Sequence, residues 1–156
     1  MSAKDKRYRL ERLLEAETAA RLAPEIRQVE ASLQEWEQEV LVANTEGIWR
    51  EDRRVRTRLF VLAVAQDGKE VQTGYAAPGL SLGLELLDLY PPKEVGEKAA
   101  RQALTNLKAR PAPAGTMPVV VGNAFGGVLF HEALGHLLET TSVAKKASVL
   151  ADRLGG

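Results

Sequence analysis

Two histidines and a glutamate in one short apolar run are the residues of this chain best suited to chemistry. The run covers residues 130–139 and holds both histidines of the protein, His131 and His136, with Glu132 beside the first. Neutral imidazoles bind a borderline-soft cation such as zinc, and an adjacent carboxylate can accept a proton from water. This is the set of groups that a hydrolytic metal site needs. The alternative is a helix that carries two histidines and a carboxylate by chance.

The spacing of the two histidines predicts a distorted helix. His-Glu-x-x-x-His is one residue longer than the His-Glu-x-x-His of ordinary zinc proteases. In a regular helix five residues rotate by about 500°, which leaves His136 roughly 140° from His131. If both imidazoles bind one metal ion, the helix must widen locally into a π-type turn, and Gly135 would ease that change.

Two neighbouring features have an alternative interpretation each. Glu139 follows His136 by three residues and is either a third metal ligand or, more commonly for a glutamate late in a helix, a solvated or capping group. The glycine-rich loop 122–127 could bind a phosphate at a helix N-terminus. Because it lacks the lysine and Ser/Thr of a P-loop, tight turning and close packing explain it better.

Composition excludes several classes of protein. The chain has 156 residues, 45% of them hydrophobic, which is enough for one domain or for one domain and part of another. Lys+Arg and Asp+Glu both number 21, so net charge gives no reason to expect binding to nucleic acid or to an anionic membrane. No run approaches the roughly 20 apolar residues of a membrane span, and the polar start is unlike a signal peptide, so we expect a cytoplasmic protein. The absence of cysteine excludes disulfides and thiolate ligands within these residues.

The first part of the chain predicts an α+β domain. Apolar residues at helical spacing predict a surface helix over residues 8–22 that Pro24 ends. The period then changes to two, with a hairpin turn at residues 44–47, a long strand over about 48–65 and a second turn at Asp67-Gly68. Together with residues 71–75 these segments predict an antiparallel sheet of about four strands. A second helix over residues 93–108 should pack on the same face of the sheet as the first.

The prolines of residues 111–118 break all periodicity, and we expect a linker there. Domain boundaries are thus predicted at 1–110 for the α+β domain and 119–156 for a second, incomplete domain. The second domain should begin with a short strand over residues 119–121, continue through the loop and carry the metal motif on a helix over about 128–139. With about 39 residues it is too small to close a core of its own.

Charged and aromatic residues of the long hairpin have a structural explanation. Five arginines of the long predicted strand over about 48–65 lie opposite three glutamates across the hairpin. Cross-strand ion pairing on a solvated face explains both groups better than a nucleic-acid patch does. The members are Arg50, Arg53, Arg54, Arg56 and Arg58, with Glu35, Glu37 and Glu39. Trp36 and Trp49 are expected to pack on a face of the sheet.

Several segments in order resemble the TldD/PmbA family of metalloproteases, whose hallmark is a His-Glu-x-x-x-His helix. Residues 126–139 are similar to its signature, and residues 39–47, 52–58 and 72–75 resemble its middle region. The likeness runs from roughly Tyr8 to the end of the chain. By position it implies that His131 and His136 are zinc ligands and that Glu132 is the general base that takes a proton from the water at the metal.

The resemblance also implies an activity and an assembly. The reaction would be hydrolysis of peptide bonds in extended or unfolded peptides, which strand edges can bind through main-chain hydrogen bonds. Family members form homodimers or heterodimers with a paralogue. They are longer, with an additional N-terminal domain and a large C-terminal domain whose cysteine is the third zinc ligand. We therefore expect this chain to be a fragment, a truncated gene product or half of a split protein, inactive alone.

A second hypothesis belongs to another class of function. If the C-terminal half is lost, the sheet domain would remain as a non-catalytic module for dimerisation or peptide binding. Zinc content separates the two hypotheses, because only the first requires a metal.

Overall fold

The computed structural model of the chain describes residues 3–123 and 125–153. It divides into two compact units, Met1–Pro111 and Ala112–Gly156, which are described separately below. Within the described residues no helix combines the length and the apolar character needed to cross a membrane.

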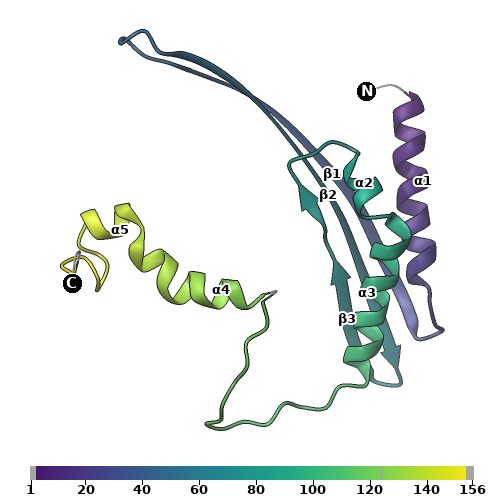
Figure 1. The fold of residues 1–156 in the computed structure, drawn as a ribbon. Helices are drawn as coiled ribbons and strands as arrows, with labels where there is room; N and C mark the ends of the chain where they lie inside the picture. Colours follow the sequence, from purple (N-terminus) through teal and green to yellow (C-terminus); the bar gives the residue numbers. More distant parts are fainter. Residues whose placement is uncertain (1–2, 124, 154–156) are drawn as a thin grey trace. The chain divides into compact units, whose positions relative to one another are not determined.

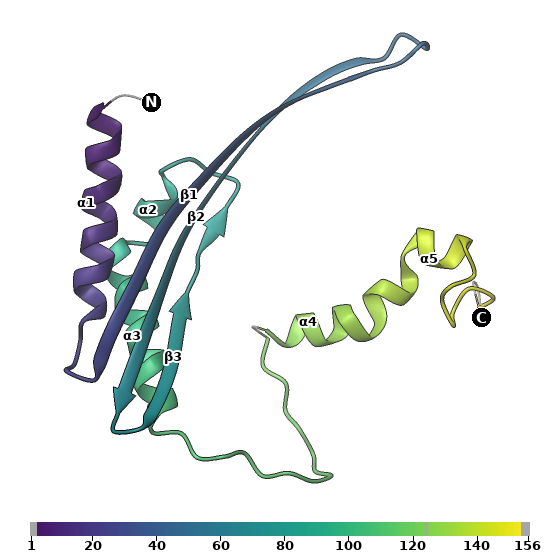
Figure 2. The ribbon, with the colours of Figure 1, turned by 180° about the vertical axis from the view of Figure 1, so that it is seen from behind.

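The first unit is an antiparallel sheet covered on one face by helices (Figures 1 and 2). The sheet has the strand order β1-β2-β3, and a short β4 also pairs with β2. The α+β class with an antiparallel sheet of four strands is thus confirmed. In chain order the elements are α1 (Ala3–Ala20), β1 (Ile26–Ala43), β2 (Trp49–Asp67), β3 (Glu70–Ala76), β4 (Gly79–Leu80), α2 (Leu86–Leu89) and α3 (Pro92–Leu107).

Both predicted hairpin turns are confirmed. In the first, the side chain of Asn44 accepts hydrogen bonds from the backbone N–H groups of Glu46 and Ile48, both at 3.0 Å. Gly47 and Gly68 have φ angles of 82° and 55°, a region in which glycine meets no steric penalty. The first turn joins two strands of unusual length, and β1 pairs with β2 from Ile26 to Ala43.

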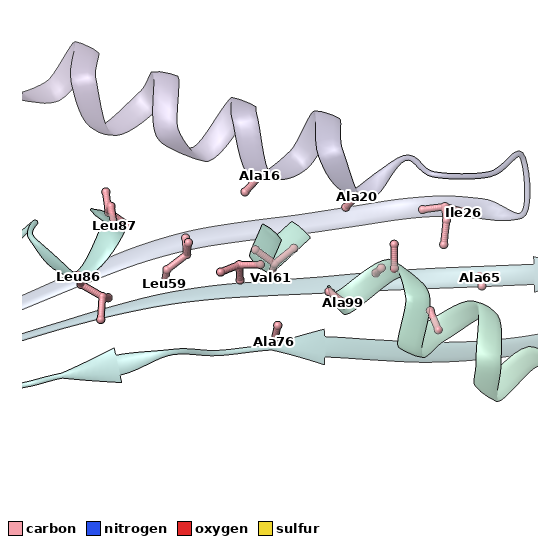
Figure 3. Packing of buried hydrophobic residues seen from close by; sticks show 14 residues of the cluster. Ala16, Ala20, Ile26, Leu59, Val61, Ala65, Ala76, Leu86, Leu87 and Ala99 are labelled. Atoms are coloured by element: carbon pink, nitrogen blue, oxygen red, sulfur yellow. The ribbon is translucent and has the colours of Figure 1, made fainter. Parts of the chain in front are cut away.

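The core lies between β2 and the helices (Figure 3). Alternate residues of β2 point to the helical face, as the period of two predicts, and they are buried from Thr57 to Ala65. The facing helices contribute small side chains for the most part. The buried helical alanines are Ala16 and Ala20 of α1 and Ala99, Ala100 and Ala103 of α3.

Two glycines allow the elements of this unit to approach closely. A Cβ atom added at Gly96 of α3 would collide with the carbonyl oxygen of Ala16 in α1. One added at Gly74 of β3 would collide with backbone atoms of Ala99 and Ala103 in α3. The backbone of α3 therefore packs directly against the backbones of α1 and β3 at these points. This confirms that α1 and α3 share one face of the sheet.

The outer edge of β3 is covered by side chains of α3. The backbone N–H of Tyr75 donates to Gln102 at 3.4 Å, and the amide of Asn106 donates to the carbonyl of Thr73 at 2.9 Å. These bonds satisfy backbone groups that an edge strand would otherwise present to solvent. Strand β1, at the other edge, pairs only with β2 within the described residues.

The distal part of the β1–β2 hairpin, residues 36–56, extends beyond β3 and β4 as a two-stranded arm (Figure 1). The expectation that Trp36 and Trp49 pack on a sheet face is wrong, because 51% and 60% of their surfaces are exposed. No helix of this unit covers the sheet so far along the hairpin. The indole N–H of Trp49 donates instead to Glu51 at 3.1 Å.

The predicted charge pairing across the arm is confirmed for one pair. Arg53 of β2 binds Glu37 of β1. Arg54 pairs within its own strand with Asp52 at 2.7 Å, and Glu35 pairs with Arg9 of α1 at 2.5 Å. The register explains the difference, because Thr57 and Val55 stand opposite Glu35 and Glu37, so that only diagonal or distant arginines reach these carboxylates.

The hydrogen bond and the charge of Arg53 lower the pKa of Glu37 below its ordinary value. A lowered carboxyl pKa means that this pair stabilises the folded state at neutral pH and that the contribution is lost as the pH falls through the pKa of folded Glu37. Both groups are exposed, so salt screens the interaction and its contribution is small.

The second unit is a series of short helical turns after an extended connection. Its elements are α4 (Gly126–Phe130), the π-helical turn η1 (His131–Gly135), the 3₁₀ turn η2 (His136–Leu138) and α5 (Thr140–Ala144). The predicted strand over residues 119–121 does not form, and Val119 and Val120 are 74% and 99% exposed. A strand needs a backbone partner, and the described part of this unit contains no other strand.

We predict that Gly96→Ala destabilises the first unit by about 1 to 3 kcal/mol, because a backbone oxygen cannot yield to the new methyl group as a side chain would. Urea unfolding followed by circular dichroism measures the loss. Gly83→Ala is the matched control, since its Cβ would meet only the carboxylate end of Glu85. A Gly96→Ala protein as stable as the parent would show that the two helices are not in backbone contact.

Candidate metal centre

The π-helical turn is the feature that builds the site. The backbone N–H of His136 donates to the carbonyl of His131, five residues earlier, and so closes a turn one residue wider than that of an α-helix. This confirms the distortion that the spacing of the histidines predicts. Because the wider turn takes up the extra residue of the spacing, His131 and His136 lie close to the same face.

The geometry of the turn brings three donor groups together. The imidazole centroids of His131 and His136 are 4.5 Å apart with the rings at 69° to each other. One ligand atom from each histidine and one from Glu132 lie within 4.8 Å of one another. Two imidazole nitrogens and a carboxylate oxygen suit zinc and neighbouring transition metals, so the donor set fits a metal ion.

Gly135 leaves room for the first imidazole. A Cβ atom at this position would lie 3.0 Å from Nδ1 of His131 and 3.4 Å from Cγ. The first distance is shorter than an ordinary van der Waals contact, so a larger residue would shift the ring by a few tenths of an ångström. The sequence predicted that Gly135 would ease the π turn, and the structure adds that it also makes space for a ligand side chain.

Glu132 and Glu139 contact opposite nitrogens of His136. An oxygen of Glu132 lies 3.4 Å from Nε2, whereas Oε1 of Glu139 lies 2.7 Å from Nδ1. Glu139 is not one of the three clustered donors. Although it occupies the N-cap position of α5, its side chain makes no capping hydrogen bond there. The side chain is exposed, as expected for a solvated group, and its carboxylate also binds an imidazole; its interpretation as a metal ligand stays a prediction.

Ser148 is a contributor that sequence reasoning missed. Its hydroxyl donates to the carbonyl of Leu137 at 2.6 Å and accepts from the N–H of Leu150 at 3.1 Å. The side chain is 7% exposed, and it fastens residues 148–150 to the end of the motif segment. The sequence gives no signal for this contact, because the two positions are eleven residues apart and follow no pattern.

The three clustered groups are exposed, and so are several apolar side chains of the same helical segment. Phe130, Leu134 and Leu138 are 64%, 50% and 59% exposed. An apolar surface of this kind on a short helical segment is typical of an interface with further protein.

Models of known protein families match both units. The model that matches residues 1–107 is described as the PmbA/TldA metallopeptidase central domain. The second is described as the PmbA/TldA metallopeptidase C-terminal domain, over residues 114–156. The chain belongs to the TldD/PmbA family. The resemblance seen in the motif and in the middle segments is thereby confirmed.

Curated relatives of the family carry the name metalloprotease. The chain is 37% identical over 112 residues to a metalloprotease of Methanothermobacter thermautotrophicus, covering 72% of this chain and 25% of that protein. It is 35% identical over 135 residues to a metalloprotease TldD homologue of Haemophilus influenzae, covering 83% of this chain and 28% of that protein. The chain thus spans about a quarter of the length of these TldD/PmbA relatives.

A solved structure shares the fold. The crystal structure of a Thermotoga maritima protein, described as a proposed modulator of a DNA gyrase, superposes with a TM-score of 0.79. It covers 97% of this chain, and this chain covers 33% of it, at 20% sequence identity. At that identity the similarity shows the fold alone.

We predict that Gly135→Ala weakens the binding of a divalent metal such as Zn²⁺ or Co²⁺ roughly tenfold, because the methyl group displaces the imidazole of His131. Competition with a chelator measures the affinity. Gly127→Ala, in α4, is the matched control because a Cβ atom there meets nothing within 4 Å. Equal affinities of the two variants would show that the ring needs no space over Gly135.

Proposed function

We propose that this chain supplies two metal ligands and the general base of a zinc-dependent metallopeptidase that cleaves extended or unfolded peptides. The observation that carries the proposal is the π turn, which gathers donor atoms of His131, Glu132 and His136 within 4.8 Å. A regular helix would separate the imidazoles, so the turn has a clear use if both bind one ion. Membership of a family whose relatives are named metalloproteases supports the same function.

The residues would divide the work as follows. When bound, zinc lowers the pKa of its water to about 7 and polarises a carbonyl group. His131 and His136 would hold the ion through ring nitrogens. Glu132 would accept the proton of the attacking water and then donate it to the leaving amine, a task for which its carboxylate lies beside Nε2 of His136 at 3.4 Å.

A third protein ligand must come from outside these residues. Catalytic zinc sites have three protein ligands as a rule, and with Glu132 acting as base the chain supplies two. The thiolate expected from the family resemblance is not available here because the chain has no cysteine. We propose that a partner subunit or further sequence completes the ligand set, and that the 156-residue chain alone binds zinc weakly and is inactive.

The assembly, the substrate and the location remain parts of this proposal. A homodimer, or a heterodimer with a family paralogue, would cover the exposed apolar residues of the motif helix. Peptides would bind by main-chain hydrogen bonds to strand edges, which tolerate many sequences. We expect a cytoplasmic protein that binds neither nucleic acid nor membrane.

The alternative function, a non-catalytic interaction module, has one structural observation in its favour. The β1–β2 arm exposes Trp36, Leu41, Val42 and Trp49 by 51% to 60%. Aromatic residues exposed on a projecting hairpin are typical of protein contacts. The two functions differ in their need for the metal motif, which the next experiment tests.

We predict that the purified chain binds one zinc ion and that His136→Ala abolishes this binding. Isothermal titration with zinc measures the stoichiometry. Asp152→Asn is the matched control, because it removes a carboxylate from the same unit without changing the donors. A chain that takes up no zinc, even at a concentration high enough to saturate a weak two-histidine site, would favour the interaction module.

The test of hydrolysis needs a protein with a complete ligand set. We therefore use a chimera in which this chain replaces the matching region of the Haemophilus influenzae relative, and we predict that it hydrolyses peptides. The chimera should cleave an unfolded fluorescent casein, and Glu132→Gln should lower kcat by about 10²-fold or more while zinc stays bound, because the amide cannot accept the proton. Undiminished turnover of the zinc-loaded Glu132→Gln chimera would rule out Glu132 as the general base.

A further inference from the structure

We infer that Glu139 is a positioning residue, which holds the imidazole of His136 in the tautomer that leaves Nε2 free to bind a metal. The inference rests on the proposed function for its purpose, but its structural content is a property of the metal-free chain. It also replaces the interpretation of Glu139 as a third ligand.

Both nitrogens of the His136 ring face carboxylates, but the contact of Nδ1 with Glu139, at 2.7 Å, is shorter than that of Nε2 with Glu132, at 3.4 Å, so it favours a proton on Nδ1. Oε1 of Glu139 and Nδ1 of His136 are 2.7 Å apart. An ionised carboxylate can only accept hydrogen bonds, so Nδ1 must be the donor. A neutral imidazole carries one N–H, and if Nδ1 holds it, Nε2 has the lone pair. Glu139 therefore selects the form of His136 that is a ligand at Nε2.

The free nitrogen points to the correct place. Nε2 lies on the side of Glu132, 3.4 Å from its Oε2, and His136 shares a donor cluster with Glu132 and His131. Nδ1 lies on the opposite side of the ring, against Glu139. Metal-binding histidines commonly donate their second nitrogen to a carboxylate, which fixes the ring and raises its basicity.

The backbone explains why Glu139 reaches the ring. Residues 136–138 form the 3₁₀ turn η2, in which side chains three residues apart are eclipsed, and the N–H of Glu139 donates to the carbonyl of His136 at 3.4 Å. Glu139 then leaves the helix with ψ at 131°. The hydroxyl of Ser148 holds the carbonyl of Leu137 within the same turn. The change from a π turn to a 3₁₀ turn thus places the carboxylate beside the imidazole.

His131 offers a comparison within the same molecule. Among residues 3–123 and 125–153 no carboxylate makes a hydrogen bond to its ring, although Glu132 belongs to the same cluster of donor atoms. The two histidines therefore differ in one respect that matters here: only His136 has a carboxylate at Nδ1. A method that reads each ring separately can use His131 as an internal control.

The first test measures the tautomer directly in the metal-free 156-residue chain, by long-range ¹H–¹⁵N correlation at about pH 8.5, where ordinary histidines are neutral. We expect His136 to be protonated at Nδ1, whereas free histidine prefers Nε2. Glu139→Ala should return His136 to the Nε2–H form and leave His131 unchanged. Asp152→Asn should change neither ring. A wild-type His136 in the Nε2–H form, or one that Glu139→Ala does not alter, would overturn the inference.

The second test separates positioning from ligation. Glu139→Ala should weaken zinc binding about 10- to 100-fold, as loss of a hydrogen-bond partner of a ligand does elsewhere, and Asp152→Asn should leave it unchanged. The visible spectrum of the Co²⁺-substituted chain should keep its band positions in Glu139→Ala, because no ligand is lost. A spectrum that reports one ligand fewer would show that Glu139 binds the metal and would contradict its positioning role.

The two tests also distinguish this inference from the proposed function. The tautomer is read without metal and without substrate, so the positioning of His136 can hold in a chain that never hydrolyses a peptide. Conversely, a zinc-loaded and active chimera with a His136 tautomer independent of Glu139 would leave the peptidase intact and exclude the role of Glu139.

Discussion

The five-residue interval between two imidazoles is the constraint on which the site depends. An α-helix would turn His136 away from His131, and the chain resolves this by giving up the regular hydrogen-bond pattern for one turn. Three further features belong to that choice: a glycine that clears space for the first ring, a tight turn directly after the wide one, and a serine that holds the end of the tight turn. The wide turn places Nε2 of His136 beside Glu132, and the narrow turn that follows places Glu139 beside Nδ1.

The sheet unit depends on a different constraint, the absence of side chains where backbones meet. Gly96 and Gly74 and a series of buried alanines let two helices and a strand approach within a distance that larger residues would forbid. Helix α3 gains a second function from this closeness, because Gln102 and Asn106 can then reach the edge of β3. Packing and edge protection thus arise from the same small residues.

Sequence reasoning predicted the features that local chemistry determines. The period of two in β2, the turn at Asn44 and the π turn follow from side-chain spacing and from glycine, so they could be predicted. Trp36 and residues 119–121 could not, because burial and strand formation depend on a partner that the described residues do not supply. Glu139 is an intermediate case. Its spacing of three residues from His136 can be read from the sequence, but the 3₁₀ turn that brings its carboxylate to the imidazole could not be predicted.

The charges on the arm affect whether another strand can pair with its open edge. Glu35, Glu37 and Glu39 lie on one face of β1, the strand whose outer edge has no strand beside it in the described sheet. If the arms of two copies were joined along β1 in antiparallel fashion with like faces together, registers centred on Glu37 would bring glutamates opposite one another. Like charges at such positions oppose pairing. The carboxylates therefore oppose edge-to-edge pairing of two arms to the extent that Arg9 and Arg53 leave their charges uncompensated, and this opposition should fail in acid, when the carboxylates are neutral.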